Sequence, residues 1–310
     1  MGNGLTDTDW NLLLSRIAKK ECTPFIGAGA CAGTLPVAWE LAREWATEHD
    51  YPLADRDNLA RVAQFLAIEQ DAMYPKELLG QKFERLEPPD FDALDEPHRS
   101  LADLNLPIYI TTNYDGFMLD ALRSRQKDPL RELCVWNDII EEQHPSQLDA
   151  GFKPTPAAPV VYHLHGHYEF PQSMVLTEDD YLAFLVRIST DNSVRLLPSA
   201  IRNALASTSL LFVGYSLSDW NFRVLFRGLV GSLGRTLARA SVAVQLSPST
   251  GEDTTGSDAA SDERRLRAQR YLNGYFEQIQ TIKVRLYWGD ARDFSRELSE
   301  RWAEHSKNGD

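Results

Sequence analysis

Three polar side chains in the middle of the chain have the types that cleavage of a bond at a sugar carbon would use. Asn113 and Asp115 follow one apolar run, residues 106–110, and His165 ends a second run that begins at Val160. Histidine titrates near neutral pH and suits a general base. An amide orients a nucleophile without adding charge, and a carboxylate stabilises a developing cation, as in glycoside hydrolysis.

The same residue types also have plain structural uses, which stay open at this point. Asn113 and Asp115 are of the types that favour turns and helix N-termini, and Asp115 could merely cap the next helix. His163, His165 and His167 alternate, so on a strand all three would face one side and could bind a metal. Because neither cysteine nor carboxylate stands at ligand spacing nearby, we predict no metal site.

A glycine loop near the start suits a phosphate group. Gly27, Ala28 and Gly29 lie between a predicted strand, residues 22–26, and a predicted helix, residues 37–49. Glycines there let the backbone approach a pyrophosphate, whose charge meets the amides at the helix N-terminus. The third glycine of the dinucleotide fingerprint is displaced by one residue, so a simple tight turn explains the loop equally well.

The order of the predicted strands and helices around these residues indicates an α/β fold. We predict a Rossmann-like parallel sheet flanked by helices, with a helical insertion. Each motif follows an apolar run, and the carboxyl ends of parallel strands meet at one crevice. We predict one domain over residues 1–310, with the insertion at about 50–105 and a mobile loop at 251–262. The predicted strands are residues 22–26, 106–110, 160–165, 209–213 and 282–288, and the main helices are residues 6–20, 37–49, 117–122 and 173–185.

Composition excludes several classes of function. A net charge of −13 argues against direct nucleic-acid binding, which needs Lys and Arg to replace counterions. The three cysteines are far apart and odd in number, so we predict neither disulfides nor a thiolate zinc site, and a cytoplasmic location. No apolar run approaches the roughly 18 residues that span a bilayer, so we predict no membrane association.

Taken together, the motifs resemble the sirtuin family, in particular its bacterial branch of NAD hydrolases in anti-phage defence. The resemblance covers roughly residues 20 to 225. It rests on the glycine loop, on Thr111-Thr112-Asn113-Tyr114-Asp115, on His163-Leu164-His165-Gly166, on Val175-Leu176-Thr177-Glu178-Asp179-Asp180-Tyr181 and on Gly214-Tyr215-Ser216-Leu217-Ser218-Asp219.

The resemblance implies a role for each matching residue. Asn113 matches the asparagine that orients water and the nicotinamide ribose, and Asp115 matches the acid that contacts the nicotinamide carboxamide. His165 matches the general base. The residues implied to hold the nucleotide are Gly27, Ala28, Gly29, Thr112, Gly214, Ser216 and, more loosely, Asp290 near adenine.

Two departures from protein-deacylating sirtuins set the predicted reaction. The two cysteine pairs of their zinc module are missing, because no cysteine follows Cys134, and the phenylalanine-arginine step after the glycine loop is absent. With no acyl group to accept the ribose, water becomes the acceptor. The resemblance thus implies an NAD glycohydrolase that forms nicotinamide and ADP-ribose, with NAD as substrate, no other cofactor and no zinc.

Two alternatives remain for the function, and control by other molecules is expected in either case. One alternative is protein deacylation or ADP-ribosyl transfer, and the other is a sensor that binds NAD or ADP-ribose without turnover. An unrestrained NAD hydrolase would drain its own cell, so we predict a homo-oligomer or a separately encoded partner. In the family such partners include a HerA-type DNA-translocating ATPase and an Argonaute-like protein.

Overall fold

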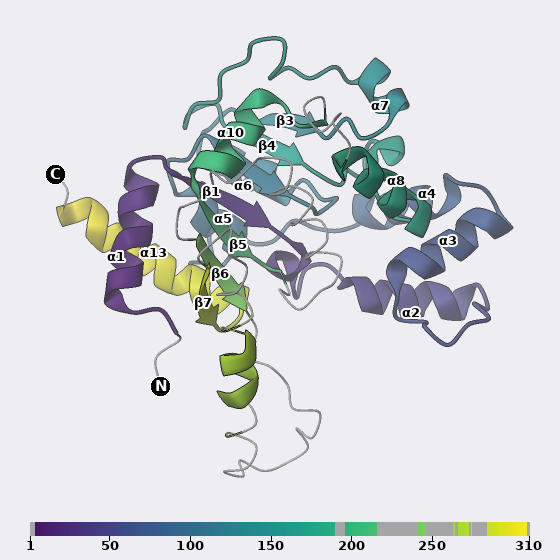
Figure 1. Cartoon of the computed structure of the whole chain (residues 1–310), viewed down its shortest axis with the longest axis horizontal. Helices are drawn as coiled ribbons and strands as arrows, with labels where there is room; N and C mark the ends of the chain where they lie inside the picture. Colours follow the sequence, from purple (N-terminus) through teal and green to yellow (C-terminus); the bar gives the residue numbers. More distant parts are fainter. Residues whose placement is uncertain are drawn as a thin grey trace.

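The computed structural model is built around a seven-stranded, all-parallel sheet with the strand order β3-β4-β2-β1-β5-β6-β7 (Figure 1). It describes residues 4–189, 196–215, 241–245, 263, 266–272, 274 and 284–308. The strands are β1 (Cys22–Ile26), β2 (Ile108–Thr111), β3 (Leu130–Leu133), β4 (Val160–His163), β5 (Ser209–Val213), β6 (Ser241–Gln245) and β7 (Val284–Trp288).

The central strands are apolar along their length because both faces of the sheet are covered. In β2, Ile108 and Ile110 enter one apolar cluster, and Tyr109 between them enters the cluster on the other face. In β5, Phe212 and Leu211 divide in the same way. The alternation shows that helices pack on both sides, which confirms the predicted Rossmann-like α/β fold.

Helices form the two outer layers. One face of the sheet packs against α1 (Asp7–Ala18), α5 (Pro97–Ala102), α6 (Phe117–Ser124) and α13 (Ala291–Asn308), with α1 and α13 side by side in Figure 1. The other face packs against α8 (Glu178–Ser189) and α10 (Ser199–Ser207). The short helix α7 (Asp138–Gln143) follows β3 in the chain.

A separate helical lobe projects from one end of the sheet (Figure 1). It consists of α2 (Ala38–Glu48), α3 (Leu59–Glu69) and α4 (Tyr74–Glu84), whose side chains form a third apolar cluster with Met174 and Leu176. Residues 50–105, which we predicted to be helical, contain α3, α4 and α5. The lobe also takes in α2, whereas α5 packs against the sheet.

The structure departs from the predictions at several places. Strands β3 and β6 were not predicted, and β4 ends at His163 instead of continuing to residue 165. The glycine loop opens into a short 3-10 helix, η1 (Ala28–Cys31), and η2 (Pro171–Ser173) is a second one. The loop predicted at 251–262 lies outside the described residues. Among the described helices, none combines the length and apolar character needed to cross a membrane.

Candidate active site

The glycine loop lies where the chain order of the strands reverses. From β1 the chain continues to β2 on one side, and β5 is the neighbour on the other side, which is where open α/β sheets bind ligands. Gly29 N donates to Gly214 O at 2.9 Å across this junction. A Cβ atom on Gly27 would lie 2.9 Å from Gly214 O, so the two strand ends need glycines to approach this closely.

The glycine loop does not lead straight into the predicted helix. The helix predicted at residues 37–49 is present as α2, which begins at Ala38, but η1, which begins at Ala28, lies between the loop and α2. Any phosphate binding by Gly27 and Gly29 would therefore use loop amides, without the dipole of a long helix. Ala28 is exposed, whereas Gly27 is buried.

Asn113 joins the end of β2 to this loop. Its side-chain Nδ2 donates to Gly27 O and to Cys31 Sγ, each at 3.2 Å, while its backbone N donates to Thr111 Oγ1 at 3.0 Å. The side chain is 7% exposed. Two motifs separated by more than eighty residues thus share one buried hydrogen-bonded site.

Asp115 precedes Gly116, the N-cap of α6, where it binds the first amide of that helix and also faces the site. Its Oδ1 accepts from Phe117 N at 3.0 Å at the start of α6, which is the structural role that remained open. Its Oδ2 accepts from Cys31 Sγ at 3.3 Å. Because the two oxygens have different partners, capping α6 does not account for the whole carboxylate.

Thr112 and Gly214 are linked through a residue that the sequence analysis did not select. Tyr215 OH lies 2.6 Å from Thr112 Oγ1 and donates to Ile26 O at 2.9 Å. Its ring packs against Phe25 in β1. Burial raises the pKa of Tyr215, so the hydroxyl keeps its proton and bridges β1 to β2. The sequence signal for Tyr215 was its place in the motif Gly214-Tyr215-Ser216, which follows β5.

The three alternating histidines do not share one face, contrary to the sequence-based expectation. The chain leaves β4 after His163 and turns at Gly166, whose φ is +84°. His163 Nδ1 lies 3.4 Å from Asn113 O, and the His163 and His167 rings are 4.8 Å apart. The His165 ring instead packs against α8. Strand alternation therefore does not assemble the three rings into one metal site.

His165 lies in an apolar environment. Its ring centroid is 5.5 Å from that of Tyr181 and 5.3 Å from that of Phe184, and it is 7% exposed. Burial lowers the pKa of His165 to about 3, so the ring is neutral at physiological pH. Its Nε2 is buried without a hydrogen-bond partner, and so is Nε2 of His163. An unsatisfied buried nitrogen is a feature that active sites tolerate.

Three further buried side chains adjoin the site, and the sequence analysis selected none of them. Cys31 Sγ lies 3.8 Å from His98 Nε2, and His98 Nδ1 lies 2.7 Å from Glu96 Oε1. Cys31, His98 and Asp115 are also a group of possible metal ligands, with ligand atoms within 4.8 Å of one another. The sequence signal for this pair was the segment Glu96-Pro97-His98, which forms the start of α5.

The remaining predicted site residues lie apart or outside the described chain. Asp290 follows β7, three strands away from β1, where its exposed side chain accepts from Asp293 N at 2.8 Å. This contact makes it the N-terminal cap of α13. Ser216 falls outside the described residues.

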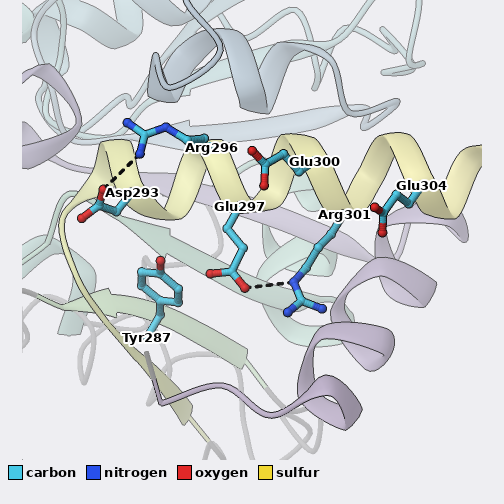
Figure 2. A pocket seen from close by; sticks show the side chains of 7 residues that line it. All are labelled: Tyr287, Asp293, Arg296, Glu297, Glu300, Arg301 and Glu304. Atoms are coloured by element: carbon cyan, nitrogen blue, oxygen red, sulfur yellow. Dashed lines mark hydrogen bonds and ion pairs between the residues drawn. The ribbon is translucent and has the colours of Figure 1, made fainter. Parts of the chain in front are cut away.

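An open pocket runs along α13, the helix that Asp290 caps (Figure 2). Two ion pairs join residues of its lining: Arg301 Nε lies 2.9 Å from Glu297 Oε1, and Arg296 lies 3.6 Å from Asp293. We therefore interpret it as a solvated helix face. It is lined by Tyr287, Asp293, Arg296, Glu297, Glu300, Arg301 and Glu304.

The fold and these contacts define a parallel α/β protein with a glycine-loop site at the point where the strand order reverses. The family follows from sequence comparison, because the model of the SIR2-like domain matches residues 107–273, more than half of the chain. The chain therefore belongs to the SIR2-like domain family, which confirms the resemblance at that level. The glycine loop lies before the matched range.

Curated relatives carry a functional name. NAD(+) hydrolase ThsA of Enterococcus faecium is 29% identical over 66% of this chain and 39% of its own length. NAD(+) hydrolase ThsA of Cytobacillus dafuensis is 29% identical over 74% of this chain and 43% of its own, and that of Bacillus cereus is 27% identical over 66% and 39%. The chain thus spans about two fifths of the length of these relatives.

Solved structures include a distant match. One described as "Structural Basis for the Mechanism and Regulation of Sir2 Enzymes" covers 95% of this chain and 97% of its own, at 11% identity and a TM-score of 0.39.

Proposed function

We propose that this protein is an NAD hydrolase that cleaves NAD to nicotinamide and ADP-ribose. The observation that carries the proposal is the hydrogen bond from Asn113 Nδ2 to Gly27 O, which joins a residue suited to bond cleavage to the candidate phosphate loop. Support also comes from membership of the SIR2-like family and from relatives named NAD(+) hydrolase.

In this proposal the substrate lies across the carboxyl ends of β5, β1 and β2. The amides of the loop at Gly27 and Gly29 contact the diphosphate, as glycine loops in α/β sheets do. Thr112, Gly214 and Ser216 complete the nucleotide side. Asp290, three strands away from β1, is the least supported contact and is proposed only for the adenine end.

In the proposed chemical step, each polar group has a role at the reacting atoms. As the bond between the ribose carbon and the nicotinamide nitrogen breaks, its electron pair goes to the pyridinium ring, and nicotinamide leaves neutral. Asn113 orients the attacking water, whose oxygen bonds to the ribose carbon. His165 takes a proton from that water, and Asp115 stabilises the cationic ribose or holds the carboxamide.

Burial makes His165 a weak base, which can still accept the strongly acidic proton of a water whose oxygen is bonding to the cationic ribose carbon. Its Nε2 has no hydrogen-bond partner among the described residues, and burial lowers the pKa of His165 to about 3. At neutral pH the ring therefore carries a free lone pair. A water or a ribose hydroxyl bound there would satisfy a nitrogen that is otherwise buried at a cost.

The first prediction is that Asn113→Ala and His165→Ala each lower kcat by about 10²-fold or more, the range typical of lost acid–base groups. Nicotinamide and ADP-ribose are measured by chromatography after incubation with NAD, across protein concentrations and with cell extract added as a source of activators. His305→Ala, in the last turn of α13, serves as control. His163→Ala tests the neighbouring ring, and we expect it to lower stability more than kcat.

The products separate this proposal from its alternatives. An acyl-ADP-ribose product would establish deacylation, and labelled ADP-ribose on protein would establish transfer. Intact NAD under every condition, with NAD binding still measurable by calorimetry, would replace hydrolysis by the sensor function. The absence of zinc is tested separately by metal analysis of the purified protein.

We further propose that the enzyme acts in the bacterial cytoplasm as an anti-phage effector that depletes NAD. Its activity is held low until a homo-oligomer forms or a partner arrives, such as a HerA-type ATPase or an Argonaute-like protein. With a net charge of −13, any nucleic-acid contact falls to that partner. Light scattering that shows a fully active monomer alone would contradict this form of control.

A further inference from the structure

A buried histidine and a buried glutamate form a pair behind the candidate site. His98 is 1% exposed and Glu96 is 2% exposed, with His98 Nδ1 at 2.7 Å from Glu96 Oε1. Glu96 is also the N-cap of α5, where its second oxygen accepts from Arg99 N. Because desolvation offsets much of the attraction, a buried ion pair is a weak source of stability. The cap of α5 accounts for Glu96, but not for the buried imidazole beside it.

The pair is connected to Asp115 through one cysteine. His98 Nε2 lies 3.8 Å from Cys31 Sγ, and Cys31 Sγ donates to Asp115 Oδ2 at 3.3 Å. Asn113 Nδ2 donates to the same sulfur at 3.2 Å. A continuous buried path therefore runs from Glu96 through His98 and Cys31 to Asp115, with Cys31 in contact with both predicted site residues.

The surroundings of His98 favour a charged ring. Cys31 of η1 and Asp115 after β2 lie toward its Nε2 side, and the Phe117 ring of α6 is 5.9 Å away, edge to face. Burial alone lowers the pKa of His98, but the hydrogen bond and charge of Glu96, with the charge of Asp115, raise it above the ordinary value. The other charged groups nearby are paired with one another: Arg99 with Asp103, and Arg292 and Arg296 with Asp95.

The same atoms could in principle hold zinc, since Cys, His and Asp are its usual ligands and His98 has a carboxylate behind it. Without a metal, the same atoms are joined by hydrogen bonds. Burial, together with the charge and hydrogen bond of Asp115, raises the pKa of Cys31 well above its ordinary value, so the thiol keeps the proton that it donates. Metal content is therefore one outcome of the test below.

We propose that Glu96 and His98 are positioning residues that act through Cys31 to hold Asp115 in place for the nicotinamide carboxamide. This inference rests on the proposed NAD hydrolysis. His98 contributes a positive charge, Cys31 contributes the hydrogen bond that orients the carboxylate, and Glu96 keeps the imidazole charged and correctly turned.

The first test compares two substitutions of the same cysteine. Cys31→Ser keeps a donor for Asp115, whereas Cys31→Ala removes it. We expect KM for NAD to stay within about threefold in the serine variant and to rise about tenfold or more in the alanine variant, with kcat changed less, as a loss of binding in ground and transition states alike would give. Equal KM values for the two variants would overturn the proposal.

The second test uses the glutamate and the pH profile. Wild-type KM is expected to rise at alkaline pH as His98 loses its charge. Glu96→Gln shifts this rise to lower pH, and His98→Gln raises KM at all pH values and removes the pH dependence. Glu132→Gln, at another buried glutamate in β3 on the edge of the sheet, is the matched control and leaves the profile unchanged. An identical profile in wild type and Glu96→Gln would overturn the proposal.

A third readout does not depend on turnover. Ring resonances of isotope-labelled histidines, assigned with His98→Gln, give the pKa of His98 directly by NMR, and melting curves confirm that each variant folds. If NAD stays intact but His98 titrates above the ordinary range and Glu96→Gln lowers its pKa, the proposed function fails while the charged pair stands. A His98 that titrates at or below the ordinary value, or one equivalent of bound zinc, would overturn the inference itself.

Discussion

At the scale of single residues, Asp115 shows why a structural and a functional interpretation need not compete. One oxygen accepts from Phe117 N and caps α6, and the other accepts from Cys31. A helix cap requires only an acceptor, which asparagine also supplies. A charge beside a developing cation requires the carboxylate. The two roles therefore respond differently to substitution.

Asp115→Asn is expected to keep the acceptor for Phe117 N and lose the charge, so the free energy of unfolding falls less than in Asp115→Ala, while NAD turnover falls strongly. Asp115→Ala loses both, and costs about 1 kcal/mol of stability in addition. Urea denaturation and nicotinamide release are measured on both variants. Full activity in Asp115→Asn would reduce this residue to a helix cap.

At the scale of elements, the junction of β1 and β5 depends on backbone atoms that touch. Gly214 has φ of +80°, and a Cβ atom there would lie 2.2 Å from Ala30 N and 2.5 Å from Gly27 O. Neither contact is with a flexible side chain, so relief would require the glycine loop to move. The candidate phosphate loop and the end of β5 are thus one structural unit.

Gly214→Ala is accordingly expected to lower the free energy of unfolding by about 3 kcal/mol or more, from overpacking added to an unfavourable φ. It is also expected to weaken NAD binding measured by calorimetry. Gly151→Ala is the matched control, since Gly151 has φ of +103° but no atom within 4 Å of the added Cβ. That control measures the cost of the backbone conformation alone, which is about 1 kcal/mol. Similar losses in both variants would contradict the close approach.

At the scale of the whole molecule, three buried neutral histidines tie stability to pH. Burial lowers the pKa of His163 to about 3, of His165 to about 3 and, with the charges of His163 and Arg131, of His167 to about 2. In the unfolded chain each of these histidines has a pKa of about 6.5. Below that pH the unfolded state binds more protons, so acid favours unfolding.

The free energy of unfolding is therefore expected to be highest above about pH 6.5 and to fall toward pH 3, by up to about 1.4 kcal/mol per pH unit for each histidine. His98 acts in the opposite sense: its pKa is raised, so its contribution is complete below the unfolded pKa and is lost as pH rises through the folded one. Urea denaturation between pH 6.5 and 4.5 measures how steeply the free energy of unfolding depends on pH, in a range where most carboxylates stay ionised. His165→Gln should reduce that slope, and an unchanged slope would contradict the pKa of about 3.

Elements with a strong apolar pattern could be predicted from the chain alone. Strands β1 and β5 were placed residue for residue, because a continuous apolar run is typical of a strand buried on both faces. Strand β3 was missed because it carries Arg131 and Glu132 at an edge of the sheet, and β4 was placed too long because Gly166 turns the chain early. Short strands of this kind depend on the partner strand more than on their own pattern.

The sequence by itself determined the parallel α/β class, the family resemblance and the positions of Asn113 and Asp115 at a strand end, because periodicity and motif spacing are local properties. Only the tertiary structure decided how the histidines divide and that Cys31 and His98 border the site. Cys31 lies 67 residues from His98 and 84 from Asp115, and the sheet brings all three together. Contacts at such separations arise from strand order and packing, which no local pattern encodes.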